Sequence, residues 1–165
     1  MVYRETREAL VAAGLLEMLR GGYDSVGIAR VLSKTGVPKG SFYHYFDSKE
    51  AFGCAIIETY GEKWRAIRRN TFERADLAPL ERLDAHFREL EEDVKAQDGL
   101  GGCLLGNLSQ LVALRSEPLR RAVETAFAEW QEDLVDVLEA AQRAGELPPT
   151  ADTEDIAALV IEAYE

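Results

Sequence analysis

Residues 36–50 read GVPKGSFYHYFDSKE, and this stretch decides the fold of the first part of the chain. Phe42 and Phe46 stand four residues apart, so on a helix they share one face. There they can pack against the apolar residues that precede them, namely Val31, Leu32 and Val37. Lys39, Tyr43 and His44 fall on the opposite side, with Ser41 and Tyr45 at the flanks. The pattern predicts a short helix over residues 39–45 with an aromatic anchor inward and hydrogen-bond donors outward.

That arrangement is what the recognition helix of a helix-turn-helix module needs in order to contact the groove and the phosphates of DNA. Gly40 removes a side chain where the start of the helix would approach the DNA backbone, and helix-start amides carry a positive partial charge. Lys49 can neutralise a further phosphate. The expected DNA-contacting residues are Lys39, Gly40, Ser41, Tyr43, His44, Tyr45 and Lys49.

Two helices are expected before this stretch and one directly after it. Apolar residues at helical spacing (Leu10, Ala13, Leu16 and Leu19) predict a first helix over about residues 4–20, ended by Gly21-Gly22. Ser25 is expected to cap a second helix that buries Ile28, Val31 and Leu32 and ends at Gly36. Asp47 and Glu50 have capping-box spacing and predict a helix reaching about residue 72.

The remainder of the chain repeats the helical pattern, and alternating strand-like runs are absent from the sequence. Amphipathic helices are expected over 79–96, from Pro118 to about 144, and from 152 or 153 onward. Residues 97–102 form a polar and glycine-rich break, and residues 102–115 are apolar on most sides, which predicts a centrally buried helix. Residues 145–151 read as a loop. The fold class is therefore all-α, with a helix-turn-helix domain at 1–50 and a helical regulatory and dimerisation domain at 51–165.

The last helix reaches Glu165 inside its apolar pattern and without a C-cap signal. We therefore expect the native polypeptide to continue, and the regulatory domain to be incomplete at its C-terminus.

The distribution of charge decides how the net charge of −11 is to be interpreted, because a strongly acidic protein is a poor partner for nucleic acid. Residues 1–50 hold seven Lys and Arg against six Asp and Glu, a net of +1. Residues 51–165 hold twelve against twenty-four, a net of −12. The acidity thus belongs to the second part, and the charge of the first part permits DNA binding without demonstrating it.

Composition excludes several classes of protein. Hydrophobic residues make up 47% of the chain, enough for a packed core. Two cysteines are too few for a disulfide scaffold and fit a reducing compartment, and neither a signal peptide nor a membrane span is recognisable, so a cytoplasmic protein is expected. No nucleophile elbow, phosphate loop or carboxylate constellation suggests an enzyme, and no cofactor is expected. Cys54, Cys103, His44 and His86 lack metal-ligand spacing.

The run from Gly36 to Phe46, followed by Ser48-Lys49-Glu50-Ala51-Phe52, resembles the signature of TetR-family transcriptional repressors. Thr6-Arg7 and Ala9-Leu10 resemble the start of that family's first helix, so the resemblance covers about residues 4–52. It implies a three-helix DNA-binding domain, a helical ligand domain, homodimerisation, and release of DNA when an inducer binds. By position, Lys39, Ser41, Tyr43, His44 and Lys49 match the family's DNA-contacting positions. The family's dimer interface lies in its last two helices, of which only part of the first falls within these residues.

Cys103 is the best candidate for a sensor residue. It follows Gly101-Gly102 and is expected in the first turn of a helix, where the helix dipole stabilises a thiolate and makes it more reactive. The segment resembles one in a TetR subgroup that senses electrophiles and unsaturated acids such as acrylate. The alternative is that Cys103 is a buried small hydrophobe. Cys54, in an apolar run, is expected to be inert.

Other polar residues of the second part leave two interpretations open. Asn107, Ser109 and Gln110 could line a ligand pocket, with Asn107 and Gln110 beside Cys103 as sensor residues. The alternative is that Asn107 caps a helix or cross-links the helical bundle. His86 is expected to be exposed or hydrogen-bonded, and Trp64, Trp130 and Tyr164 are expected to serve packing.

The sequence favours a ligand- or electrophile-responsive repressor that binds a palindromic DNA operator as a homodimer. Its expected partners are double-stranded DNA, a small-molecule or electrophile inducer and a second copy of the chain. The alternatives are a helical interaction protein and a thiol-based redox sensor without sequence-specific DNA binding.

Overall fold

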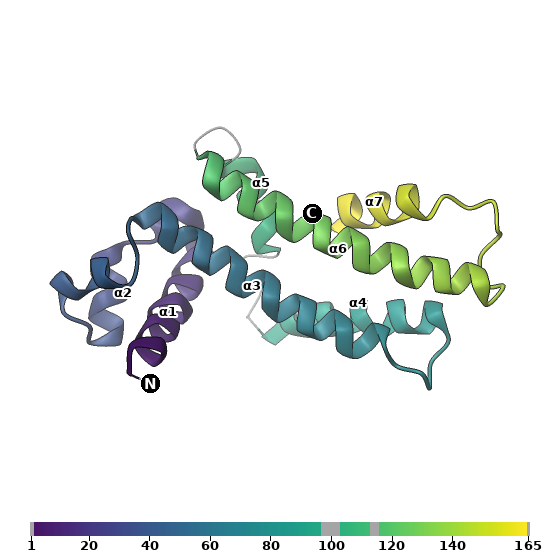
Figure 1. Ribbon diagram of the computed structural model, residues 1–165, viewed down its shortest axis with the longest axis horizontal. Helices are drawn as coiled ribbons and strands as arrows, with labels where there is room; N and C mark the ends of the chain where they lie inside the picture. The colour runs from purple at the N-terminus through teal and green to yellow at the C-terminus, as the bar shows by residue number, and fades with distance from the viewer. Residues whose placement is uncertain (1, 97–102, 113–115, 165) are drawn as a thin grey trace. The chain divides into compact units, whose positions relative to one another are not determined.

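The computed structural model describes residues 2–96, 103–112 and 116–164, and within these ranges it contains helices and no strand (Figure 1). The predicted all-α fold class is confirmed. The chain forms two compact units, one of residues 1–61 with 100–124 and the other of residues 62–99 with 125–165. Helices α3 (Lys49–Phe72) and α6 (Glu117–Arg143) contribute to both units.

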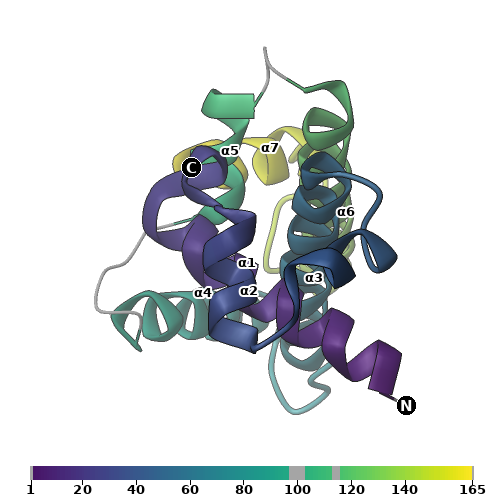
Figure 2. The same cartoon turned by 90° about the vertical axis from the view of Figure 1, so that its left-hand side faces the viewer.

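The first unit contains α1 (Val2–Ser25), α2 (Ile28–Thr35), the 3₁₀ helix η1 (Lys39–His44) and α5 (Leu104–Val112), with the first parts of α3 and α6. Figure 2 shows α2 lying beside α1, against which it packs. Gly21 and Gly22 have non-helical backbone angles, and the φ of Gly22 is 71°, a value that favours glycine. The predicted stop at Gly21-Gly22 is therefore a kink, after which one further turn leads to Ser25.

The caps of the next helices differ from the prediction in two places. Gly36 ends α2 in the left-handed conformation, as predicted. Ser25 does not cap α2, because Gly27 holds that position and the Ser25 hydroxyl donates to the carbonyls of Glu17 and Gly22. At α3 the cap is Ser48, whose Oγ accepts the amide of Ala51 at 2.9 Å, so the predicted box of Asp47 and Glu50 is wrong by one residue.

The buried stripe of α1 is also different from the predicted one. Leu16 is 52% exposed, whereas the inward face carries Leu10, Val11, Gly14, Glu17 and Met18. Gly14 explains the choice of face. A Cβ atom there would lie 2.5 Å from Cζ of Phe52 and 2.6 Å from Cδ1 of Ile56, so the absent side chain lets α3 approach α1 closely.

The second unit contains α4 (Pro79–Ala96), α7 (Thr153–Tyr164) and the remaining parts of α3 and α6. Asp152 caps α7, since its Oδ1 accepts the amides of Glu154 at 3.1 Å and Asp155 at 3.0 Å. In Figure 1, α7 returns beside α6, and the rings of Trp130 and Tyr164 meet edge to face at 5.2 Å. Trp64 and Trp130 are buried, which confirms their predicted packing role.

Two predictions for residues 97–115 can be compared with the structure only in part. The predicted break at 97–102 lies outside the described residues. Of the predicted buried helix at 102–115, the structure describes α5, in which Leu104, Leu105 and Leu108 are buried while Asn107, Gln110 and Leu111 are exposed. The prediction of a centrally buried helix is wrong for α5, because one of its faces packs on α1 while the face with Asn107, Gln110 and Leu111 is exposed.

His86 is a further correction. It is 1% exposed, and neither ring nitrogen has a hydrogen-bond partner among the described residues. Its ring meets that of Phe72 edge to face, with the centroids 5.1 Å apart. Burial, followed by the nearby charge of Arg68, lowers the pKa of His86 to about 4, because both disfavour the charged imidazolium.

We expect Gly14→Ala to destabilise the protein. Alanine gains about 1 kcal/mol in helix propensity over glycine. Overpacking against the fully buried Phe52 and Ile56 costs about 1–3 kcal/mol, so the net effect should be a loss. Urea unfolding measures it, with Gly40→Ala as the control because nothing lies within 4 Å of a Cβ at that position. Equal losses in both variants would contradict the close-packing argument.

We expect the stability of the second unit to decrease as the pH falls from about 6.5 to about 4. The unfolded chain protonates His86 throughout this window while the folded chain does not, so unfolding takes up a proton. The free energy of unfolding should therefore be about 3 kcal/mol lower at pH 4 than above pH 6.5.

Urea midpoints measured across that window should depend less on pH in His86→Leu than in the natural chain. His44→Leu is the matched control, because His44 is exposed. An unchanged pH dependence in His86→Leu would refute the assignment to His86.

Candidate nucleic-acid interface

Three phenylalanines form the base on which η1 rests. Phe42 and Phe52 are fully buried and Phe46 nearly so. Their ring centroids lie 5.5 Å apart for Phe42 and Phe46, 5.3 Å for Phe42 and Phe52, and 4.7 Å for Phe46 and Phe52. The predicted inward anchor of Phe42 and Phe46 is therefore confirmed, with Phe52 of α3 as its partner.

The opposite side of η1 faces solvent. Lys39, Gly40, Tyr43 and His44 are exposed, Tyr43 to 64%, and Ser41 and Tyr45 are half-buried at the flanks. The element is a 3₁₀ helix of six residues and not the α-helical turn that the recognition motif suggested. Because 3₁₀ hydrogen bonds have poorer geometry than those of an α-helix, the position of η1 depends on the side chains that hold it.

The first turn of α1 supplies part of that support. The hydroxyl of Tyr3 donates to the carbonyl of His44 at 3.0 Å, and its ring stacks on that of Tyr45 with the centroids 4.7 Å apart. The guanidinium of Arg7 lies 5.1 Å from the centre of the Phe46 ring. Sequence reasoning missed Tyr3, because the contact joins residues about forty positions apart and no local pattern indicates it.

The Lys49-Glu50 pair at the start of α3 has two different environments. The Nζ of Lys49 lies 4.8 Å from the centre of the Tyr23 ring, and the side chain is half-buried. The carboxylate of Glu50 accepts a hydrogen bond from Ser116 Oγ, which also accepts the amide of Leu119 at the start of α6. The beginnings of α3 and α6 are thereby joined within the first unit.

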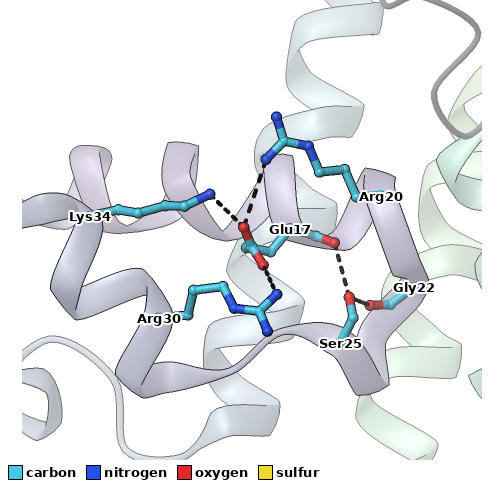
Figure 3. A network of polar contacts seen from close by, with 6 residues as sticks. All are labelled: Glu17, Arg20, Gly22, Ser25, Arg30 and Lys34. Carbon is cyan, nitrogen blue, oxygen red and sulfur yellow. Dashed lines mark hydrogen bonds and ion pairs between the residues drawn. The ribbon is translucent and has the colours of Figure 1, made fainter.

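A second residue that sequence reasoning missed is Glu17, whose side chain on α1 is 4% exposed and surrounded by cations (Figure 3). Lys34 Nζ lies 2.5 Å from Oε1, Arg30 Nη1 lies 2.8 Å from Oε2, and Arg20 Nη1 lies 3.9 Å from Oε1. The hydrogen bonds from Lys34 and Arg30 lower the pKa of Glu17 despite its burial, so the carboxylate is charged. The signal in the sequence was its position seven residues after Leu10, which places both residues on one face of α1.

The predicted sensor residues lie at the start of α5 and along it. Cys103 is half-buried and directly precedes the helix, with its carbonyl accepting the Asn107 amide at 3.0 Å and its Sγ 3.5 Å from the Gly106 nitrogen. Cys103 thus stands at the cap position and not inside the first turn. The side chains of Asn107 and Gln110 are exposed. Cys54 is half-buried in α3, where burial raises the pKa of its thiol.

The described residues of the second unit line at least two cavities, and neither of these is lined by Cys103, Asn107 or Gln110. One of about 210 Å³ is lined by Arg65, Arg69, Phe72, Glu73, Arg82, Asp133, Asp136, Val137 and Ala140. The other, of about 370 Å³, is lined by Ala128, Gln131, Glu132, Val135, Asp136 and Glu154. Among the described residues, no cluster of His, Cys, Asp and Glu could hold a metal ion. The described helices include none that is long and apolar enough to cross a membrane.

Two family models match the chain. The model for bacterial regulatory proteins of the tetR family matches residues 10–52, which include α2 and η1. The model for the tetracyclin repressor-like C-terminal domain matches residues 79–165.

Individual relatives agree with the family models. The chain is 37% identical over 150 residues to the transcriptional regulator AcuR of Cereibacter sphaeroides, covering 91% of this chain and 68% of that protein. It is 33% identical over 120 residues to the repressor NemR of Escherichia coli, covering 73% of this chain and 60% of NemR. The chain thus spans about two thirds or less of the length of these relatives.

Solved structures show the same similarity. A regulatory protein TetR from Rhodobacter sphaeroides superposes with a TM-score of 0.87 at 37% identity, over 93% of this chain and 82% of that one. The reduced form of E. coli NemR superposes with a TM-score of 0.81 at 30% identity, over 97% and 84% of the two chains. With a helix-turn-helix at its start and a matching helical remainder, the chain belongs to the TetR family of bacterial transcriptional regulators.

Proposed function

We propose that this protein represses transcription in the cytoplasm by binding a near-palindromic DNA operator as a homodimer, and that an inducer releases it. NemR, a relative named as a repressor, supports repression as the mode of regulation. The protein acts by binding and release and not by catalysis. The observation that carries the proposal is the exposed polar face of η1 on a fully buried aromatic base.

The DNA contacts divide into two kinds. Lys39 and Lys49 neutralise phosphates, and the exposed Tyr43 and His44 of η1 reach the base edges or the sugar-phosphate backbone of the groove. The same face includes Gly40, which permits close approach of the DNA backbone. Ser41 and Tyr45 contact that backbone from the flanks. We assign this activity to residues 1–50, as the family match at 10–52 supports.

We further propose that Cys103 is the point at which an electrophile acts, with the exposed Asn107 and Gln110 contributing to its surroundings. Cys103 directly precedes α5, and α5 packs on α1, the helix whose first turn contacts η1. A group added to the Cys103 sulfur would press on the start of α5. Because α1 and α5 belong to one compact unit, the change can reach the DNA-binding face through a single helix contact.

Lys39→Ala is expected to weaken DNA binding by about tenfold and to reduce the slope of log affinity against log salt by about 0.9, the value for one phosphate contact. Tyr43→Ala should weaken binding without changing that slope. Fluorescence anisotropy on a DNA fragment selected from random sequence measures both. Lys95→Ala on α4 is the control, since Lys95 pairs with Glu91 on an exposed surface. If both η1 variants bind as the natural chain does, η1 is not the recognition element.

Cys103→Ser is expected to abolish release of DNA by a thiol-reactive electrophile while leaving DNA affinity unchanged. Cys54→Ser is the matched control and should keep full release, because burial raises the pKa of the Cys54 thiol and so reduces its thiolate fraction. A gel-shift titration with the electrophile distinguishes the two variants. Full release of Cys103→Ser would show that another residue senses the electrophile.

A further inference from the structure

The ion-pair cluster of Glu17 connects the two helices that precede η1. Glu17 lies on α1, and its cations Arg30 and Lys34 lie four residues apart on α2, on one face of that helix (Figure 3). Each carboxylate oxygen accepts a hydrogen bond from one of these cations: Oε2 from Arg30 and Oε1 from Lys34. Two directional bonds spaced along one turn hold α2 against both rotation and sliding on α1.

Stability alone gives no reason for a charged residue at this position. Taking the Glu17 carboxylate out of water has a desolvation cost that can exceed its attraction to cations whose own side chains remain exposed. Well-packed apolar replacements are often as stable. A buried ion pair is more demanding in its geometry than an apolar contact, and its best-attested use is to select one register. Here the register would be that of α2 on α1.

The register of α2 is passed on to η1 over a short distance. Only residues 36–38 separate the two elements, and α2 packs against η1. At the other end of α2, the Glu17 backbone carbonyl accepts the hydroxyl of Ser25 at 2.9 Å, which fixes the chain that leads into the helix. Glu17 therefore makes two kinds of contact with this segment. Its backbone carbonyl binds Ser25 before α2 begins, and its side chain binds Arg30 and Lys34 within α2.

Glu17 also limits the positive charge of the module. The side chains of Arg30 and Lys34 are 65% and 40% exposed, so their charges are accessible to solvent as well as to Glu17. Without the carboxylate, residues 1–50 would have a net charge of +2 in place of +1. A more positive surface attracts DNA of any sequence.

We propose that Glu17 is a positioning residue for DNA recognition, which fixes α2, and through it η1, in the register that one DNA sequence requires, while restraining non-specific attraction. This inference rests on the proposed function, since it presupposes that η1 contacts DNA.

The test is Glu17→Gln, which removes the charge and keeps the size. Anisotropy titrations with the full chain use the selected fragment and a scrambled fragment of equal length. Affinity for the selected fragment should fall by about tenfold. Affinity for the scrambled fragment should stay the same or rise, so the ratio of the two falls. Glu8→Gln is the matched control, because Glu8 forms an exposed pair with Arg4 on the same helix and should leave the ratio unchanged.

A merely structural role would give a different result. If Glu17 only stabilised the fold, both affinities would decrease together, in proportion to the unfolded fraction from thermal unfolding, and this outcome would overturn the proposal. So would an unchanged ratio. Should Glu17→Gln fail to fold, Glu17→Leu replaces the cluster with an apolar contact and is judged by the same ratio. If the natural chain itself binds no DNA from the random pool, the proposed function fails, a result distinct from failure of the Glu17 assignment.

Discussion

The contact between Gly14 of α1 and Phe52 of α3 is the constraint on which the rest of the first unit depends. With no side chain at Gly14, the Phe52 ring enters the space beside α1 and its other sides meet Phe42 and Phe46. The three rings then fill the space beneath η1, so the polar residues of η1 can only face solvent. The close approach of α1 and α3 at Gly14 thus determines which face of η1 is exposed.

A base of apolar rings resists separation from α3 but does not by itself fix the orientation of a six-residue 3₁₀ helix. Hydrogen bonds and charge-assisted pairs are more sensitive to direction than aromatic packing is. Directional contacts surround the base: Tyr3 holds the end of η1, and Glu17 holds α2 before it. Burial positions η1, and polar contacts orient it.

Local signals in the sequence were sufficient for the elements and for the inward and outward faces of η1. Gly36 marked the end of α2, and the four-residue spacing of Phe42 and Phe46 marked the buried side. Features that depend on tertiary neighbours were not predictable. Leu16 has the hydrophobicity of a core residue, yet it is exposed because Gly14 and Glu17 determine which face of α1 turns inward.

The same limit applies to the buried polar residues. Burial of an unpaired charge is costly, so a local pattern gives no reason to expect Glu17 or His86 in the interior. Which partners approach from other helices is known only from the structure. Glu17 keeps its charge in the interior because Arg30 and Lys34 approach from α2. His86 differs from Glu17, because no described residue hydrogen-bonds to its ring nitrogens and burial beside Arg68 leaves it neutral.

The charged state of Glu17 matters for how residues 1–50, with a net charge of +1, could select one DNA sequence. Non-specific attraction scales with the number of phosphates neutralised, and a nearly neutral module has little of it. Under the proposed function, affinity comes from the fit of η1 to the groove, and that fit depends on the orientation that the Glu17 ion pairs give to α2 and η1. The charge of +1, which permits DNA binding without demonstrating it, is therefore consistent with a binder that relies on geometry.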